Sequence, residues 1–311
     1  MATMTAAPAA NLVNDAARRH DFVLLFDVQD GNPNGDPDAG NMPRLDPETM
    51  QGLVTDVSLK RKLRDWVDLA RGGEERFKIY VQNKGVALND LHQRAYTALG
   101  LKSTGSRQVR GDVDHARQWM CQNFYDIRTF GAVMSTGVNA GQVRGPVQLT
   151  FARSIDPIVP LDLSITRVAI TDPKAAQVVE GDEGKSTGGK LTEIGKKTLV
   201  PYGLYKSYGF VSPSFARQTG FSDEDLTLLW QGLQQMWDLD HSSSRGLLSC
   251  RGLYVFTHED RLGNAPAHVL LERVRARRKN VERPARTFAD YEVTVDDTAL
   301  PMGVTLTRLV G

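Results

Sequence analysis

The alternation of apolar and polar residues along the chain predicts strands and helices in mixed order. The apolar run Phe22–Val28 predicts a buried strand, which ends in a loop rich in Gly, Asn, Pro and Asp over residues 30–41. Between Asp56 and Arg71 apolar residues recur at helical spacing, with Thr55 or Asp56 as N-cap and two glycines as the stop. The same patterns predict helices at 90–99, 113–125 and 222–239, and strands at 77–81, 147–155, 163–170, 202–211, 252–257, 291–295 and 304–309.

This order of elements favours an α+β fold of the ferredoxin-like or RNA-recognition type, with further segments inserted between the core elements. Residues 171–199 are rich in Gly and Lys and poor in apolar side chains, which predicts a projecting insertion or long hairpin. Residues 1–18 begin with an Ala-rich stretch that lacks the pattern of a signal peptide, so we expect a disordered lead-in there. A single domain with insertions is expected over 19–311.

Composition and charge narrow the classes of protein that the pattern allows. The chain has 311 residues, of which 41% are hydrophobic and 24% charged, so it has enough apolar material for a sizeable core. Its 38 Lys and Arg against 37 Asp and Glu give a formal charge of +1. A polyanion would therefore have to be bound by local clusters of cations, because the molecule as a whole is not basic.

The cysteines and the lack of long apolar windows indicate a cytoplasmic protein without a membrane partner. Cys121 and Cys250 form no CxxC, which suits a reducing compartment and gives no disulfide framework or zinc site. No window approaches the roughly 20 apolar residues of a membrane-spanning helix. The six histidines match no HExxH pattern, no Gly-x-Ser-x-Gly elbow occurs, and no motif calls for a cofactor.

The loop after the first strand and the helix at 56–71 form the most informative segment. A Gly- and Asn-rich loop feeds a helix N-terminus, where unpaired N–H groups and the helix dipole attract anions. Cationic side chains follow at Arg44, Lys60, Arg61 and Arg64, and the i,i+4 spacing of Lys60 and Arg64 places these two on one helix face. This arrangement fits a phosphate backbone. The alternative is a solvated basic helix face, which is commoner for such a run.

Two metal interpretations of the same loop are weaker. Asp30, Asn32, Asn34 and Gly35 match part of a calcium-loop pattern, but Asn41 stands where a bidentate Glu is required. The loop aspartates, Asp36 and Asp38 among them, are candidates for a metal-dependent nuclease. Acid-rich turns are far commoner than either kind of site.

Other motifs carry less information. Residues 181–187 resemble half of a P-loop but lack its first Gly, and two acids stand where phosphates would sit. Lys206–Val211 nearly reproduces an RNA-recognition strand, the alternative being a strand whose aromatic side chains face the core. The cluster His241–Gly246 favours a helix cap and turn over a catalytic Ser/His pair. The basic run of residues 273–286 is either a solvated face or a contact surface for a polyanion.

Several of these segments together resemble the backbone subunit of a type I-C CRISPR surveillance complex (Cascade), the Cas7 branch of the RAMP proteins. The resemblance covers residues 20–260 approximately. The segments that carry it are Phe26-Asp27, Gly31–Pro37, Ser58–Arg61, Asp126–Val133, Pro201–Tyr205 and His241–Gly246.

The resemblance implies a modified RNA-recognition palm, helical fingers over about 83–145 and a thumb hairpin over about 171–200. It also implies copies of the chain stacked along the spacer of a crRNA, other Cascade subunits as partners, target DNA paired with the guide, and no cleavage by this subunit. The turn at 130–134 would lie beside a kinked nucleotide. The RNA-binding residues expected on this basis are Asn32, Asn34, Arg44, Thr55, Ser58, Lys60, Arg61, Arg64, Phe130, Gly131, Met134, Lys206 and Arg245.

A subunit that accepts any spacer should hold phosphate and ribose and leave the base edges free. Our hypothesis is that the helix-terminal N–H groups, with Lys60, Arg61 and Arg64, supply most of the attraction for the guide. The alternative function is a metal-dependent endoribonuclease, because RAMP relatives cut target RNA with an aspartate in the corresponding loop. Asp36 or Asp38 would take that role here, although the loop supplies no recognisable acid–base partner.

Overall fold

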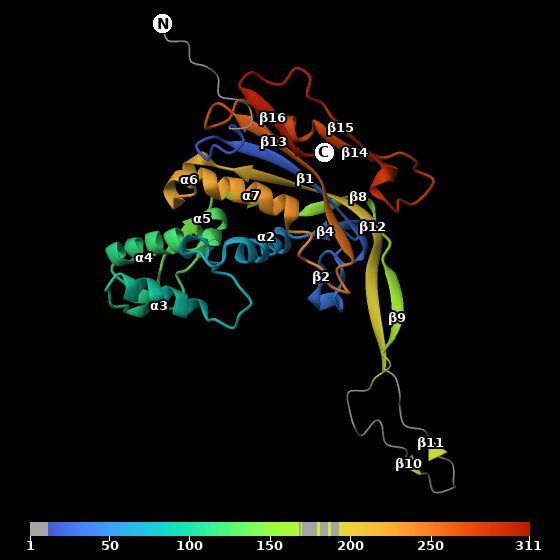
Figure 1. The fold of residues 1–311 in the computed structure, drawn as a ribbon, viewed down its shortest axis with the longest axis horizontal. Helices are drawn as coiled ribbons and strands as arrows, with labels where there is room; N and C mark the ends of the chain where they lie inside the picture. Colours follow the sequence, from blue (N-terminus) through green and yellow to red (C-terminus); the bar gives the residue numbers. More distant parts are fainter. Residues whose placement is uncertain (1–11, 168, 170–178, 181–185, 188–192) are drawn as a thin grey trace.

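A computed structural model describes residues 12–167, 169, 179–180, 186–187 and 193–311, and centres on an antiparallel sheet (Figure 1). The strand order is β16-β13-β1-β12-β8-β4, and β7 and β9 also pair with β12. The central strand β1 therefore lies between β12 and β13, antiparallel to both. The strands of this sheet are β1 (His20–Gly31), β4 (Gln51–Val54), β7 (Val147–Leu149), β8 (Ala152–Pro157), β9 (Leu161–Arg167), β12 (Glu193–Val211), β13 (Leu247–His258) and β16 (Val304–Val310).

Helices α2 (Asp56–Arg71), α6 (Pro213–Thr219) and α7 (Asp223–Gln235) lie along one face of the sheet (Figure 1). Phe22, Leu24 and Phe26 of β1 point into the main apolar core between this face and the helices. The ring of Phe26 stacks between those of Tyr205 and Trp237, with centroid distances of 5.4 and 4.5 Å. Stacked aromatic pairs of this kind fix the helix layer against the sheet.

The opposite face of the sheet is covered by the C-terminal part of the chain. Val23 and Leu25 point to this side and pack in a second core with α8 (Ala267–Leu271), β14 (Val274–Arg278) and β15 (Tyr291–Val295). Burial on both faces explains why the first strand is a continuous apolar run and does not alternate.

A helical unit inserted between α2 and β7 has a core of its own, which includes Tyr96, Met120 and Ile127. It contains α3 (Leu88–Ala98), α4 (Arg110–Asn123), α5 (Tyr125–Phe130), β5 (Gly131–Val133) and β6 (Gln142–Arg144). Short elements complete the description: β2 (Gly35–Asp36), η1 (Pro37–Ala39), β3 (Met42–Pro43), η2 (Glu75–Phe77), η3 (Gly105–Arg107), β10 (Val179–Glu180), β11 (Ser186–Thr187) and η5 (Phe288–Asp290).

Most of the predicted elements are present. The helix over 56–71 is confirmed with Thr55 as its N-cap, and Ser222 caps α7, although α7 ends at Gln235. The strand at 77–81 is wrong: the backbone N–H groups of Tyr80 and Val81 donate to the carboxylate of Asp126 instead of to a neighbouring strand. Residues 147–155 divide into β7 and β8, and 202–211 is the second half of the longer β12. Helices α5 and α6 had no predicted counterpart.

Two predictions concern the ends of the described ranges. Residues 12–18, assigned to a disordered lead-in, are folded against α7: Ala16 donates its N–H to Asp223 at 2.8 Å, and Trp230 donates to the carbonyl of Val13 at 3.0 Å. The thumb prediction at 171–200 and the partial P-loop at 181–187 fall mostly outside the described residues. Where the chain is described, β9 and the first residues of β12 form an antiparallel hairpin with Leu161 opposite Leu199.

A buried ion pair joins the inserted helices to the helix layer. Arg128 of α5 and Asp225 of α7 are both fully buried, with 2.6 Å between the guanidinium Nη2 and a carboxylate oxygen. Arg128 also donates to the carbonyl of Arg76, and Asp225 accepts from the backbone of Ser222. The charges of this cluster are therefore paired with each other and with backbone groups, as burial of charge requires.

We expect the substitution Asp225→Asn to lower the free energy of unfolding by about 3–5 kcal/mol, because the buried guanidinium of Arg128 then lacks a counter-charge. Urea denaturation followed by tryptophan fluorescence measures the change. Asp114→Asn is the control, since Asp114 pairs with Arg117 at the surface and should change stability by no more than about 1 kcal/mol. If the two substitutions lower the free energy of unfolding equally, the buried pair of Arg128 and Asp225 is not a special contributor to stability.

The carboxylate of Asp225 should also make the free energy of unfolding depend on pH in the acidic range. Burial by itself raises the pKa of Asp225, but the hydrogen bonds and charge of Arg128 outweigh it and hold the pKa below the ordinary 3.8. A depressed folded-state pKa gives stabilisation that is complete above the unfolded-state pKa and is lost as the pH falls through the folded-state value. Unfolding free energies measured over acidic pH should show a smaller decline for Asp225→Asn than for the native chain.

Candidate nucleic-acid interface

The loop after β1 is locked to the start of α2 by one side-chain oxygen. Oδ1 of Asn34 accepts hydrogen bonds from the backbone N–H of Thr55 at 2.9 Å and from its hydroxyl at 3.0 Å. The Thr55 oxygen in turn accepts from the N–H of Ser58 at 3.3 Å. The N-terminus of α2 is thereby held against the loop, with its positive end facing the space between them.

A second set of contacts ties this loop to the segment before β13. The backbone N–H of Asn32 donates to the carbonyl of Ser244 at 2.8 Å, and its side-chain amide donates to the carbonyl of Asn41 at 2.7 Å. Arg245 donates to the carbonyls of Asn32 and Pro33 at 3.2 and 3.3 Å. Only glycine fits at Gly31, because a Cβ there would collide with the Arg245 carbonyl. Asn32 is itself 4% exposed, so it shapes the loop.

These contacts enclose a polar groove of about 660 Å³, which brings together seven of the predicted RNA-binding residues. The groove lies where the loop, the start of α2 and the segment before β13 meet. The seven are Asn32, Asn34, Arg44, Thr55, Ser58, Arg61 and Arg245. The sequence did not single out its other lining residues as ligands, notably Val57, Phe151, Ser242 and Ser244. Ser242 and Ser244 belong to the cluster at 241–246. The several hydroxyl groups beside Arg245 in that cluster are the feature of the sequence that could have identified them as groove residues.

Each of the three arginines of the groove has a carboxylate at ion-pair distance. Arg61 is exposed and lies 3.7 Å from Asp65, Arg44 lies 3.3 Å from Asp36, and Arg245 lies 3.5 Å from Asp240. Nε of Arg44 is buried and has no hydrogen-bond partner within the described structure. Burial, with a smaller repulsion from Arg61, lowers the pKa of Arg245 below its ordinary value. Two guanidinium groups that repel each other at close range are stabilised when an anion binds between them.

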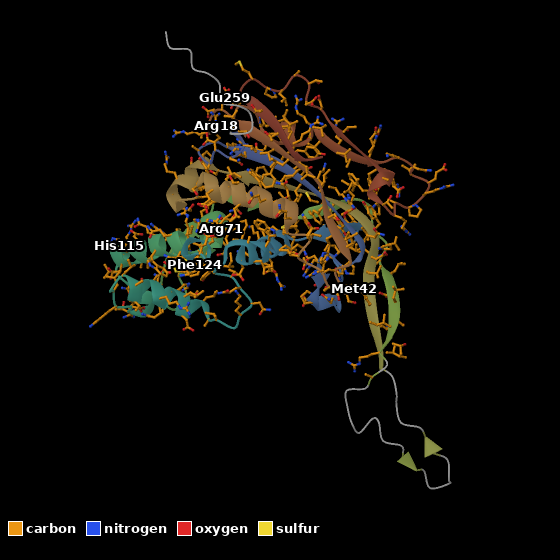
Figure 2. The ribbon with its side chains drawn as sticks, in the orientation of Figure 1. Arg18, Met42, Arg71, His115, Phe124 and Glu259 are labelled. Carbon is orange, nitrogen blue, oxygen red and sulfur yellow. The ribbon has the colours of Figure 1, made fainter. Side chains whose placement is uncertain are left out.

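A smaller groove of about 330 Å³ continues this surface toward the β9–β12 hairpin. The two grooves share Asn32, Asn41 and Ser244 in their linings. Met42, labelled in Figure 2, lines the smaller groove together with Lys196 from the root of the hairpin. An extended chain could therefore run from the start of α2 to the hairpin without leaving a polar surface.

Two of the predicted cations of α2 point elsewhere. Arg64 is 11% exposed, and its Nε lies 2.7 Å from the buried carboxylate of Asp126. Lys60 pairs with Asp56 at 2.9 Å. Both cations also lie over the ring of Phe130, with 5.5 Å to its centroid from Lys60 and 5.3 Å from Arg64. Their shared helix face therefore joins α2 to the inserted helices, and Arg61 alone of the three lines the groove.

The two apolar side chains that flank β5, those of Phe130 and Met134, are also internal, although Val133 between them is 67% exposed. Phe130 is 7% exposed and Met134 fully buried, so neither presents a free stacking surface. Gly131 has φ +84°, and a side chain there would collide with the carbonyl of Val143. On β12, Lys206 lies 5.5 Å from the ring centroid of Tyr208, on the sheet face that the C-terminal part covers. The near-match to an RNA-recognition strand thus has its aromatic side chains packed in the second core.

The metal interpretations find little support in the geometry. The carboxylate of Asp36 accepts from the N–H of Asp38 at 3.2 Å and pairs with Arg44. Among the described residues, no three His, Cys, Asp or Glu side chains are grouped so that they could hold a metal ion. Within the same residues, no helix is long and apolar enough to cross a membrane.

The basic run at 273–286 is largely used to build the C-terminal cover. Arg273 donates to the carbonyls of Thr298 and Ala299 at 2.8 and 3.2 Å. Arg277 pairs with Glu292 across the two strands at 2.7 Å. The solvated-face interpretation therefore holds for part of the run, whereas Arg273 holds a neighbouring loop through hydrogen bonds to its carbonyl groups.

Comparison with known proteins gives three findings. The family model described as CRISPR-associated protein Cas7 matches residues 18–296. A protein of Haloferax volcanii with that same description is 27% identical over 237 residues, which is 70% of this chain and 64% of the relative's own length. Two solved structures each contain a chain that is 15% identical to this one. The first is described as "CRISPR RNA-guided surveillance complex, pre-nicking"; its TM-score is 0.49, and the match covers 78% of this chain and 79% of that chain. The other, from a CRISPR RNA-guided surveillance complex, has a TM-score of 0.42 over 77% and 70%.

The substitution Asn34→Ala should open the lock between the loop and α2. It leaves the N–H of Thr55 without its acceptor, so we expect the unfolding free energy to fall by about 1–2 kcal/mol. Amide hydrogen exchange at Thr55 should speed up at the same time. Asn34→Asp retains an acceptor oxygen and is the matched control. If exchange at Thr55 is as slow in Asn34→Ala as in the control, the hydrogen bond is not what holds the loop.

Proposed function

The chain belongs to the family of CRISPR-associated protein Cas7, and from this premise we propose that it is a non-catalytic crRNA-binding backbone subunit of a type I-C surveillance complex. The groove at the start of α2 is the observation that carries the proposal. It combines a helix N-terminus with Arg44, Arg61 and Arg245, and polar amides and hydroxyls complete its lining. These groups hold phosphate and ribose without reading bases.

The guide is proposed to follow the groove and not the open face of a sheet. The neighbour order β13-β1-β12-β8 supports the proposed RNA-recognition palm, as does the position of α2 and α7 on one common face of the sheet. In such palms the other sheet face stacks bases on aromatic side chains. Here that face is packed against α8, β14 and β15, which leaves the loop side of the palm for the RNA.

The proposed organisation assigns residues 19–311 to one palm with fingers at about 83–145 and a thumb at about 171–200. Copies of the chain are proposed to stack along the spacer, with other subunits of the complex at the ends and target DNA paired to the guide. Leu161, Leu163 and Ile165 of β9 support contacts between copies, since each is at least 44% exposed on one side of the hairpin. A cytoplasmic location is proposed with this role.

The proposal is tested by the RNA that the purified protein carries. The native chain should co-purify with RNA of uniform length. The double substitution Arg44→Gln and Arg61→Gln removes two guanidinium–phosphate contacts and should lower RNA affinity at least about tenfold. The ratio of bound RNA to protein measures the loss, and thermal unfolding checks that the fold is kept.

The matched control is the double substitution Arg275→Gln and Arg283→Gln, which changes the net charge equally on the C-terminal cover. It should leave the bound RNA unchanged. Native protein without RNA, or equal loss in both variants, would contradict the proposal.

The enzymatic alternative has its own measurement. A guide-paired RNA incubated with the protein and Mg²⁺ should remain intact, because Asp36 is engaged by Arg44 and by the turn it caps. Cleavage that disappears in Asp36→Ala or Asp38→Ala would instead establish the endoribonuclease.

A further inference from the structure

A buried lysine lies behind the groove at the start of α2. Lys62 is 5% exposed and belongs to the buried stripe of α2, together with Leu63 and Trp66. It does not line the groove, although its neighbour Arg61 does. A lysine at a buried position is unusual, because taking an ammonium group out of water is costly unless a counter-charge stays beside it.

The counter-charge of Lys62 is the carboxylate of Asp240, in the segment before β13. Oδ2 of Asp240 accepts a hydrogen bond from Nζ of Lys62 and also lies 3.5 Å from Nε of Arg245. The three side chains therefore form a chain of charges that runs from the buried side of α2 to the groove. Two cations and one anion leave one positive charge of this set for a ligand.

The carboxylate of Asp240 lies closer to the lysine than to the arginine. Arg245 has shorter contacts with the loop after β1, since its Nη1 donates to the carbonyls of Asn32 and Pro33 at 3.2 and 3.3 Å. Among the ion pairs of the described residues, Arg245 is the groove arginine whose carboxylate also pairs with a lysine. Its charge is thus the least neutralised by its own partner.

We propose that Lys62 is a positioning residue for RNA binding, which holds the carboxylate of Asp240 and so keeps the guanidinium of Arg245 against the loop and free to pair with a phosphate. Lys62 itself is too deeply buried to touch a strand in the groove. Stability alone gives no reason for the lysine, because replacing a buried ion pair by apolar residues is often neutral or stabilising. The inference rests on the proposed function, in which the guide lies in this groove.

The experiment titrates a fluorescein-labelled single-stranded RNA of arbitrary sequence with protein freed of RNA in high salt, and follows anisotropy at several salt concentrations. Lys62→Met should weaken binding about tenfold, as Arg245→Gln does, because each removes one guanidinium–phosphate contact. Each should also flatten the slope of log K against log salt by about 0.7, the contribution of one phosphate of a single strand.

Double substitutions separate positioning from a simple loss of charge. If Lys62 acts through Arg245, then Lys62→Met combined with Arg245→Gln should bind no more weakly than Arg245→Gln alone. Lys62→Met combined with Asp240→Asn should bind like the native chain, because no carboxylate is left to neutralise Arg245. A lysine that attracted RNA by its charge alone would weaken binding in the Arg245→Gln background as well.

The pH dependence of binding is an independent readout. Burial, and then repulsion from Arg245 and Arg61, lower the pKa of Lys62 to about 7. The carboxylates of Asp65 and Asp240 act in the opposite direction. Lys62 is charged below its pKa and neutral above it, and a neutral Lys62 releases Asp240 to Arg245. The affinity of the native chain relative to Lys62→Met should therefore fall toward equality between about pH 6 and pH 10.

The matched control is Lys84→Met, which removes a surface lysine that lies 2.6 Å from Asp68 and outside the groove lining. It should leave the affinity and the salt slope unchanged, and thermal unfolding checks that every variant is folded. Additive losses with Arg245→Gln, no recovery with Asp240→Asn, or a constant ratio of native to Lys62→Met affinity over the pH range would each overturn the inference alone. A native chain that does not bind the RNA would overturn the proposed function, and the inference with it.

Discussion

A single amide oxygen, Oδ1 of Asn34, organises the candidate interface. By accepting from both the N–H and the hydroxyl of Thr55, it fixes the loop after β1 against the cap of α2. The cap in turn sets where the helix dipole points and where Arg61 projects. The contacts of Asn32 and Arg245 then hold the other side of the same loop, so that the donors of both sides line one groove. The attraction of the groove for an anion therefore depends more on how its N–H and guanidinium groups are arranged than on how many cations it contains.

The C-terminal part of the chain decides which surface remains for a ligand. It packs against the sheet face that carries Tyr208 and Phe210 and leaves these two rings only partly exposed. Hydrogen bonds and an ion pair of Arg273 and Arg277 hold this part of the chain in place. In the proposed function, the nucleic acid is therefore contacted at the loop edges of the fold. Such a surface suits a strand of arbitrary sequence, because it offers hydrogen-bond donors for phosphate and ribose.

The sequence pattern predicted those elements whose structure depends on residues close together in the chain. The helix at 56–71 and its Thr55 cap follow from spacing and capping alone, and the apolar run of β1 indicated burial on both faces. Tertiary partners decided the rest. Tyr80 and Val81 have the composition of a strand, but Asp126, far along the chain, takes their N–H groups. Lys60 and Arg64 resemble Arg61 in sequence, and only the positions of Asp126 and Phe130 separate their roles.

The ion pair between Arg64 and Asp126 has a mechanical consequence. It joins α2, whose first turn frames the groove, to the inserted helices, because Asp126 belongs to α5. A displacement of the inserted helices would therefore have to break this buried charge pair or carry α2 along with it.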